Sequence, residues 1–282
     1  MTRPYAEVIG DPIAHTKSPL IHNFWMEKLG IDAEYRACHV LPEELEDYFT
    51  RRRGDAEWLG CNVTIPHKER VAALIPNLLS GYDNFGALNL VVQRPEGLFG
   101  ANTDVEGVAG PLNMFHVGAF EFGQVPRRTV AVIGAGGAAR AALFGLKNMA
   151  FAKTFRILVR RLEQGHSLSQ QLGLSAEVMP ITDESLAGVD ILINASPLGM
   201  VGKPALELAL DRMGGGTGQP LLFEMVYAPL ETQLVSAARS LSFEVIDGLD
   251  MLVGQASSAF ELLFGQSPPR EHDAELRELL IR

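Results

Sequence analysis

The chain has 282 residues, of which 47% are hydrophobic and 21% charged, a composition typical of a globular protein with enough apolar side chains for a core. This length predicts two domains rather than one. Because 34 acidic residues outnumber 24 basic ones and give a formal net charge of -10, the composition excludes a broad positive surface for nucleic acid or an anionic membrane.

The cysteines and the first residues bear on where the protein acts. Cys38 and Cys61 show neither CxxC spacing nor a disulfide framework, which fits a reducing compartment and argues against a structural metal site. The opening segment lacks the charged-then-apolar layout of a signal peptide, and no segment reaches the roughly 18 apolar residues of a membrane span. We therefore expect a cytoplasmic protein, monomer or homodimer, with no membrane or nucleic-acid partner.

The N-terminal part alternates between strand and helix patterns. It is expected to form an α/β domain over residues 1–105. Strands are predicted at Tyr5–Gly10, Ala33–Val40, Trp58–Thr64, Leu88–Gln93 and Leu98–Asn102, and helices at Pro19–Leu29, Pro42–Arg53 and His67–Ala73.

A second α/β pattern follows a short helix and loop expected over residues 109–125. Strands that alternate with helices predict a parallel, doubly wound, Rossmann-type sheet, here over residues 106–248. A final helix at Leu249–Phe264 opens a segment, 249–282, that we expect to return to the first domain. The predicted elements of the second domain are strands at Arg128–Ile133, Thr154–Val159, Ile191–Asn194 and Leu221–Met225, and a helix at Ala138–Met149.

A glycine-rich turn follows the strand at Arg128–Ile133 and fits the pattern Gly-x-Gly-x-x-Ala. Gly134 permits the tight turn, Gly136 lets a pyrophosphate approach the backbone, and Ala139 lets helix and strand pack closely. The helix N-terminus then offers N–H groups to the phosphates. A bare structural turn is the alternative. The predicted dinucleotide contacts here are Gly134, Ala135, Gly136, Gly137 and Ala138.

The residues after the next strand bear on which dinucleotide is bound. An NAD enzyme usually has Asp or Glu there, whereas this chain has Arg160 and Arg161. A guanidinium can pair bidentately with a 2′-phosphate, so Arg160 predicts NADP, with NAD as the weaker alternative. The other possibility is that both arginines are solvated surface charges.

Further segments join turn-forming residues to hydroxyl, amide or charged side chains, as loops that bind small polar ligands do. Their order and spacing resemble the shikimate dehydrogenase family from about Gly10 to about Phe264. The segments that carry the resemblance are Gly10–Pro19, Asn62–Lys68, Gly86–Asn89, Gly100–Asp104, Asn194–Met200, Val226–Thr232 and Asp247–Gln255.

The resemblance implies a catalytic pair, Lys68 in Asn-Val-Thr-x-Pro-x-Lys and Asp104 in Gly-x-Asn-Thr-Asp. Hydride transfer between a nicotinamide and a ring ketone leaves negative charge on oxygen, which the Lys68 ammonium would stabilise and protonate. Asp104 would orient Lys68 and favour its ammonium form, whereas burial would oppose that form. A structural salt bridge between loops is the alternative.

The resemblance also implies the ligand contacts. Each hydroxyl or amide side chain among them is individually as well suited to a cap or a turn. Met251 is equally well suited to an ordinary core. The implied substrate contacts are Thr16, Ser18, Thr64, Asn89, Tyr227 and Gln255, and the implied cofactor contacts are Asn194, Ala195, Ser196, Gly248 and Met251.

Several residues depart from the family pattern. Thr16 replaces the usual serine and Leu90 the usual threonine, and both substitutions bear on the shape of the substrate pocket. Weaker selectivity for NADP is implied by Val159 in place of asparagine and Gln164 in place of a second cation. The remaining departures are Glu224 for aspartate, Ser242 for glycine and Asp250 for glycine, and the sequence offers no account of Asp250.

The resemblance implies an NADP-dependent oxidoreductase of the aromatic amino acid precursor pathway that acts on 3-dehydroshikimate and shikimate between two domains. Quinate or aminoshikimate dehydrogenases, and a sensor that binds NADP and shikimate without turnover, remain open. A dehydrogenase for one-carbon folates would need an aromatic pterin site, which these polar loops do not offer. No metal is expected, because His15, His22 and His67 show no ligand spacing.

Overall fold

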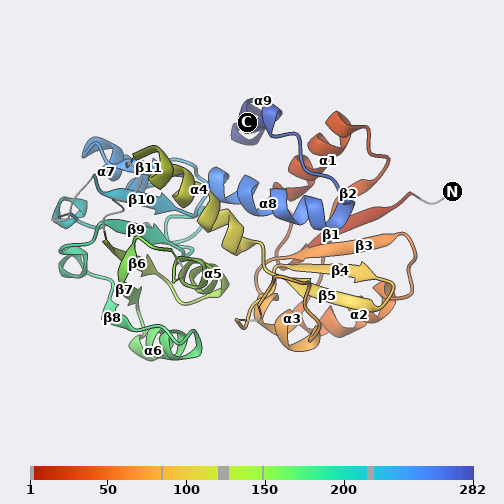
Figure 1. The fold of residues 1–282 in the computed structure, drawn as a ribbon, viewed down its shortest axis with the longest axis horizontal. Coiled ribbons are helices and arrows are strands. Elements are labelled where there is room, and N and C mark those ends of the chain that lie inside the picture. The colour runs from red at the N-terminus through yellow and green to blue at the C-terminus, as the bar shows by residue number, and fades with distance from the viewer. Residues whose placement is uncertain (1–2, 84, 120–126, 148, 215–218) are drawn as a thin grey trace. The chain divides into compact units, whose positions relative to one another are not determined.

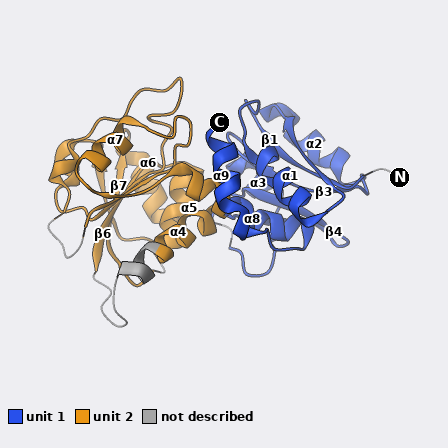
Figure 2. Cartoon of the chain, turned by 90° about the horizontal axis from the view of Figure 1, so that it is seen from above, with its two compact units in different colours: residues 1–103, 255–282 blue, residues 104–254 orange. Residues whose placement is uncertain are grey.

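The computed structural model of the chain describes residues 3–83, 85–119, 127–147, 149–214 and 219–282, with residues 115–119 described by backbone only (Figure 1). The chain forms two compact units, Met1–Thr103 with Gln255–Arg282, and Asp104–Gly254 (Figure 2). Each unit is built on its own sheet with covering helices. The predicted α/β fold is confirmed.

The first unit contains a five-stranded sheet in the order β2-β1-β3-β4-β5. β1 pairs in parallel with β2 and β3, whereas β4 is antiparallel to both β3 and β5. The carboxyl ends of β1, β2, β3 and β5 and the start of β4 therefore lie along one edge of the sheet. The strands are β1 (Tyr5–Gly10), β2 (Glu34–His39), β3 (Trp58–Val63), β4 (Leu90–Arg94) and β5 (Gly97–Ala101).

Helices cover both faces of this sheet. Successive strand residues point to opposite faces, so each strand contributes side chains to both layers of helices. α2 (Leu45–Arg52) and α3 (Lys68–Leu74) pack on the face that carries Tyr5 and Ile9 of β1. The predicted helix at Pro42–Arg53 begins with a 3-10 turn before α2. On the other face, aromatic side chains of α1 (Ser18–Leu29) and α8 (Gly248–Phe264) meet, and the helix after α8 is α9 (Asp273–Ile281).

The histidine of α1 lies inside this aromatic layer. The His22 ring stacks on Tyr35 of β2 with the ring centroids 4.0 Å apart. Within the described part of the chain neither ring nitrogen has a hydrogen-bond partner. Burial lowers the pKa of His22 to about 3, so the ring is neutral at physiological pH. His67 is also buried, with Nε2 2.7 Å from the carbonyl oxygen of Val40, whereas His15 is exposed.

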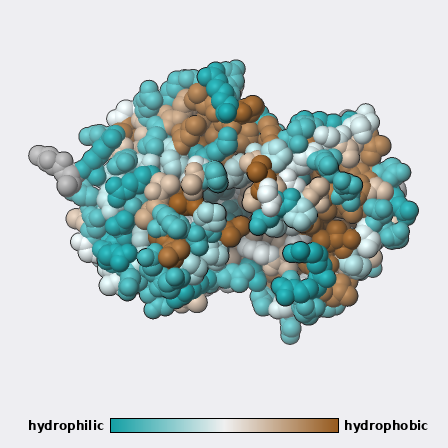
Figure 3. Space-filling view, turned by 180° about the vertical axis from the view of Figure 1, so that it is seen from behind, coloured by the Kyte–Doolittle hydropathy of each residue, from teal (hydrophilic) through white to brown (hydrophobic). Residues whose placement is uncertain are grey.

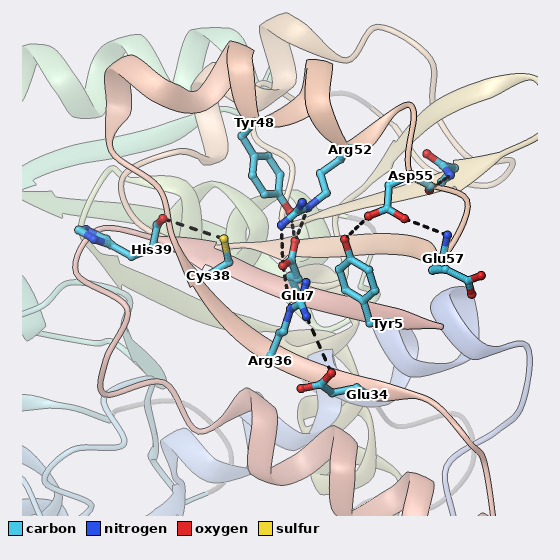
Figure 4. Close-up of polar contacts among 11 residues, drawn as sticks. Tyr5, Glu7, Glu34, Arg36, Cys38, His39, Tyr48, Arg52, Asp55 and Glu57 are labelled. Atoms are coloured by element: carbon cyan, nitrogen blue, oxygen red, sulfur yellow. Dashed lines mark hydrogen bonds and ion pairs between the residues drawn. The ribbon is translucent and has the colours of Figure 1, made fainter. Parts of the chain in front are cut away.

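A buried carboxylate joins α2 to the first sheet (Figure 4). Glu7 of β1 is 1% exposed and accepts hydrogen bonds from Arg52 Nε at 2.8 Å and Nη2 at 2.9 Å. It also accepts bonds from Arg36 Nε at 3.1 Å and the Tyr48 hydroxyl at 2.8 Å. Burial lowers the pKa of Arg52, but its hydrogen bond and attraction to Glu7 outweigh burial and raise it. Glu7 therefore neutralises guanidinium groups from two elements.

The second unit contains a six-stranded parallel sheet in the order β11-β10-β9-β6-β7-β8. From β6 the chain proceeds outward to β7 and β8, then returns to the other side of β6 for the remaining strands. The direction of winding reverses between β6 and β9, which is where doubly wound sheets bind ligands. The strands are β6 (Arg128–Ile133), β7 (Ala152–Val159), β8 (Ala176–Pro180), β9 (Ile191–Asn194), β10 (Leu221–Glu224) and β11 (Glu244–Ile246).

The second unit contains the start of α8, up to Gly254, and the helices α4 (Asp104–Ala119), α5 (Gly137–Leu146), α6 (Leu162–Gln171) and α7 (Gln233–Ser240). α4 begins five residues before the predicted helix at 109–125, and residues 120–126 of that prediction lie outside the described residues. Gly107 does not end α4 but allows α8 to pack closely against it. A Cβ added at Gly254 of α8 would lie only 3.3 Å from the Cα atom of Gly107.

Figure 3 shows a largely hydrophilic face on which hydrophobic residues form separate patches. Large exposed apolar side chains include Ile65, Met114 and Val201. Among the helices of the described residues, none has the length and apolar character needed to cross a membrane.

The end of α7 leads to a stability prediction. Ser242 has φ 59°, and the N–H groups of Ser242 and Phe243 donate to the carbonyls of Arg239 and Ala238, which is the Schellman pattern. Because a Cβ is strained in this left-handed conformation, Ser242→Gly is expected to raise the free energy of unfolding by about 0.5–1 kcal/mol. Urea denaturation measures the effect.

The matched control is Ser240→Gly in the last helical turn of α7, where glycine should lower stability by about 0.5 kcal/mol. A destabilised Ser242→Gly protein would contradict the strain at this position.

Candidate active site

The glycine-rich turn connects β6 to α5 at the carboxyl edge of the second sheet. Gly134 has φ 116°, and a Cβ there would lie 2.9 Å from the carbonyl oxygen of Ala195. Gly136 is exposed and caps α5, and a Cβ added to it would meet nothing within 4 Å in the described part of the chain. The backbone above Gly136 and the N-terminus of α5 are therefore open to a phosphate group, so these residues fit a dinucleotide.

Arg160 directly follows β7 at the same edge of the sheet and is exposed. Among the described residues, neither Arg160 nor its neighbour Arg161 has a carboxylate partner that would neutralise it, so both fit an added phosphate. Val159, the departure before Arg160, is buried against α6, where a Cβ added to Gly165 would lie 3.1 Å from its Cγ2 atom. Gln164 is exposed.

The segment after β9 is held by the side chain of Asn194. Its Oδ1 accepts hydrogen bonds from the N–H of Ser196 at 3.2 Å and from the Ser196 hydroxyl at 2.7 Å. Its Nδ2 donates to the carbonyl of Leu198 at 3.1 Å. Asn194 is fully buried, whereas Ala195 and Ser196 are half-buried and therefore accessible to a ligand.

Glu224, at the carboxyl end of β10, takes part in this site in a way the sequence did not indicate. It is fully buried, and its carboxylate accepts hydrogen bonds from Asn194 Nδ2 at 2.8 Å, the Val226 N–H at 3.0 Å and the Thr232 hydroxyl at 3.1 Å. Burial raises the pKa of Glu224 to about 7, although these hydrogen bonds act in the opposite direction. The signal that could have revealed it is a carboxylate at the end of an otherwise apolar strand.

The start of α8 explains two family-pattern positions. A Cβ added at Gly248 would lie 2.5 Å from the carbonyl oxygen of Val226, so glycine is required. Asp247 Oδ1 accepts from the Leu249 N–H at 3.0 Å, and Asp250 Oδ2 accepts from the Asp247 N–H at 3.2 Å. Asp247 thus caps α8 through its second residue, and Asp250 binds back to the N-cap N–H as in a capping box, which accounts for the charge at Asp250. Of the other candidates in this unit, Tyr227 and Met251 are partly buried, and burial raises the pKa of Tyr227.

The candidate substrate segments of the first unit lie along the edge where β1, β3 and β5 end. Thr64 donates its N–H to the carbonyl of Ile9 at 2.9 Å. Asn89, just before β4, receives the Thr103 N–H on Oδ1 at 2.7 Å and donates Nδ2 to the Thr103 hydroxyl at 3.0 Å. The Val63 N–H also donates to the carbonyl of Asn89 at 2.7 Å, so three of the segments are connected and the structure brings Thr64 and Asn89 to one edge of one sheet.

The loop before α1 lies at the same edge, since it follows β1 directly. Ser18 begins α1 and is 7% exposed, and Thr16 Oγ1 lies 3.3 Å from both the hydroxyl and the N–H of Ser18. Lys17 donates a hydrogen bond to the carbonyl of Leu280 in α9. The hydroxyls of Thr16 and Ser18 are thus paired, and the intervening cation is bound to the C-terminal helix.

The two residues of the expected catalytic pair begin helices in different units. Lys68 is the first residue of α3 and is half-buried, and its carbonyl accepts the Leu88 N–H at 3.0 Å. Asp104 is the first residue of α4 and of the second unit, and it is 3% exposed. Gln255, within α8, is 9% exposed and is the residue at which the chain re-enters the first unit. The meeting of Lys68 and Asp104 stays a prediction.

A doubly wound sheet with an open glycine turn and an exposed arginine at its carboxyl edge is characteristic of a two-domain, dinucleotide-dependent dehydrogenase. Models of the shikimate dehydrogenase substrate binding domain and of the shikimate 5'-dehydrogenase C-terminal domain match residues 8–91 and 248–275. The "Shikimate dehydrogenase (NADP(+))" of Sphingopyxis alaskensis is 44% identical over 279 residues, 99% of this chain and 97% of the relative. The chain belongs to the shikimate dehydrogenase family.

Other relatives and solved structures agree. The protein of the same name from Mesorhizobium japonicum is 36% identical over 98% of this chain and 95% of its own length. A crystal structure of shikimate 5-dehydrogenase from Thermus thermophilus in complex with NADP(H) and shikimate matches with a TM-score of 0.82 at 28% identity, covering 98% of this chain and 99% of that one. Quinate dehydrogenase from Corynebacterium glutamicum has the same fold at a TM-score of 0.82, with 23% identity over 98% of this chain and 99% of that one.

Proposed function

We propose that this protein is an NADP-dependent oxidoreductase that interconverts shikimate and 3-dehydroshikimate, in the pathway to the aromatic amino acids. The observation that carries the proposal is the open glycine turn at the switch point of the second sheet, with Arg160 after the adjacent strand. The NADP-dependent relatives named above support the choice of substrate and cofactor. The first unit would supply most of the substrate contacts, with Tyr227 from the second unit, and the second unit would bind the cofactor.

In this proposal the dinucleotide is held by the Gly134–Ala138 turn, by Ala195 and Ser196, and by Arg160 at its 2′-phosphate. When bound, it supplies the acceptor or donor of hydride. Oxidation removes a hydride from the carbinol carbon of shikimate and a proton from its oxygen, and Lys68 Nζ takes up that proton. In the reverse direction the Lys68 ammonium stabilises the developing oxyanion and protonates it, while Asp104 orients Lys68.

Hydroxyl and amide groups suit a carboxylated polyol, because a substrate that lacks a hydroxyl would leave their buried polar atoms unpaired. The residues assigned to the substrate are Thr16, Ser18, Thr64, Asn89, Tyr227 and Gln255. Gly248 and Met251 are assigned to the nicotinamide end of the cofactor. We place the enzyme in the cytoplasm as a monomer or homodimer, and the free thiols of Cys38 and Cys61 support a reducing compartment.

The direct test is to mix the purified protein with shikimate and NADP⁺ at mildly alkaline pH and to follow the absorbance of the reduced nicotinamide. Quinate and aminoshikimate, each with NADP⁺ and with NAD⁺, are the comparison substrates. The proposal predicts the highest kcat/KM for shikimate with NADP⁺. Calorimetric binding of both ligands without turnover would instead identify a sensor.

Arg160→Ala is expected to weaken NADP⁺ binding by about 10–100-fold, because a charged hydrogen bond to the 2′-phosphate contributes about 1.5–3 kcal/mol. Binding of NAD⁺, which lacks that phosphate, should stay within about twofold of wild type on the same reasoning. Calorimetric titration with each dinucleotide measures both values.

The matched control is Arg161→Ala, which removes the neighbouring exposed guanidinium. Equal losses for NADP⁺ and NAD⁺ in Arg160→Ala would show that Arg160 does not bind the phosphate.

A further inference from the structure

The Glu224 carboxylate connects two turns that the proposed function assigns to ligands. Glu224 ends β10 and is paired in register with Asn194 at the end of β9. Its Oε1 accepts both the Asn194 Nδ2 and the Val226 N–H, whereas Oε2 accepts the Thr232 hydroxyl. The two oxygens thus serve different purposes, since Thr232 belongs to the N-terminus of α7.

The first contact of Oε1, together with the bond from Asn194 Nδ2 to the Leu198 carbonyl, sets the orientation of the Asn194 amide. With Nδ2 directed at Glu224, Oδ1 is directed at the N–H and the hydroxyl of Ser196. If the amide were reversed, its NH₂ group would face the Ser196 N–H and that bond would be lost, while the Ser196 hydroxyl would have to turn and accept instead of donate. The turn that this amide holds also lies against the glycine turn, since the Ala195 carbonyl packs against Gly134.

The second contact of Oε1 fixes the segment that leads to Tyr227. The N–H of Val226 is bound by Glu224, and its carbonyl oxygen lies where a Cβ at Gly248 would be only 2.5 Å away. The N–H of Val226 is therefore bound by Glu224 at the end of β10, while its carbonyl lies close against the first residue of α8. A movement of Val226 toward α8 would therefore press on Gly248.

We propose that Glu224 is a positioning residue for nucleotide binding, which acts by orienting Asn194 and Val226 and through them Ser196 and Gly248. The inference rests on the proposed function, because the turns it concerns are those assigned to the dinucleotide. The contact with Thr232 allows this positioning role to be tested apart from a purely structural role of Glu224. The Thr232 hydroxyl accepts the Val235 N–H at 3.2 Å and caps α7, so the contact of Oε2 stabilises a helix without touching either turn.

The experiment is calorimetric titration of the full chain with NADP⁺ alone, which reports the Kd of folded molecules and, through the stoichiometry, the folded fraction. Glu224→Ala is expected to raise the Kd about tenfold, equivalent to about 1.4 kcal/mol. Glu224→Gln keeps an oxygen acceptor for Asn194 and Val226 and should stay within about threefold of wild type. Thr232→Ala should lower the Tm but leave the Kd within about twofold, because it removes only a cap.

A Glu224→Ala protein with the wild-type Kd and only a lower stoichiometry would overturn the inference, as would an equal loss of affinity in Thr232→Ala. If Glu224→Ala does not fold, Ser196→Ala removes the hydroxyl that Asn194 orients and is expected to raise the Kd about threefold. An unchanged Kd in that variant would also overturn the inference. Failure of the proposed function is distinguishable, because the wild-type protein itself would then not bind NADP⁺.

Discussion

Lys68→Ala is expected to lower kcat about a thousandfold, a loss within the range for removal of a general acid that also stabilises an oxyanion. The cofactor should still bind, since Lys68 acts on charge that develops at the substrate. The Kd for NADP⁺ is therefore expected to stay within about twofold of wild type, so that the loss falls on turnover. Steady-state rates with shikimate and NADP⁺, combined with calorimetry, separate these quantities.

The control for Lys68 is Lys17→Ala. Lys17 lies in a loop at the same edge of the first sheet, but its ammonium is bound to the carbonyl of Leu280 rather than directed to the proposed chemistry. This variant should retain kcat within about threefold, since only a part-buried hydrogen bond to α9 is lost. Near-normal turnover of Lys68→Ala would remove Lys68 from the mechanism.

Glu7→Gln is expected to lower the free energy of unfolding by about 3 kcal/mol, because it leaves charged guanidinium groups next to a buried neutral amide. Glu7 is 1% exposed and binds Arg36, Arg52 and Tyr48 (Figure 4). The side chains of Arg36 and Arg52 are 43% and 21% exposed, so partial rehydration keeps the effect at the lower end of the range for buried pairs. Urea denaturation monitored by circular dichroism measures it.

The comparison is Arg3→Ala, which breaks the ion pair between Arg3 and Asp32, whose side chains are 53% and 93% exposed. That substitution should cost less than about 1 kcal/mol. Similar losses in the free energy of unfolding for Arg3→Ala and Glu7→Gln would show that burial of Glu7 does not increase its contribution to stability.

Much of the fold could be predicted because strong patterns coincide with buried elements. The strand at Arg128–Ile133 has the predicted limits, and its residues from Val130 onward are fully buried. The missed strands are weakly patterned. β8 (Ala176–Pro180) lies at the edge of the sheet and has no fully buried residue, and β11 (Glu244–Ile246) has only three residues.

The site was predictable where a residue type serves one physical purpose. Gly134 and Gly248 are needed because another part of the backbone lies where a Cβ would be. The motifs indicate this requirement by having glycine at these positions. For Glu224 the sequence offered only a carboxylate at the end of an apolar strand, and for Asp250 it offered no signal, because both roles depend on hydrogen bonds to the backbone of Val226 and Asp247. Sequence order alone does not indicate such contacts.

The most direct test of the catalytic pair is a double-mutant cycle with Lys68→Ala, Asp104→Asn and the double variant, measured as kcat/KM for shikimate with NADP⁺. If the ammonium and the carboxylate act as one unit, the double variant should lie within about threefold of the poorer single variant. Losses that multiply would show that Lys68 and Asp104 act independently, and would contradict the mechanism.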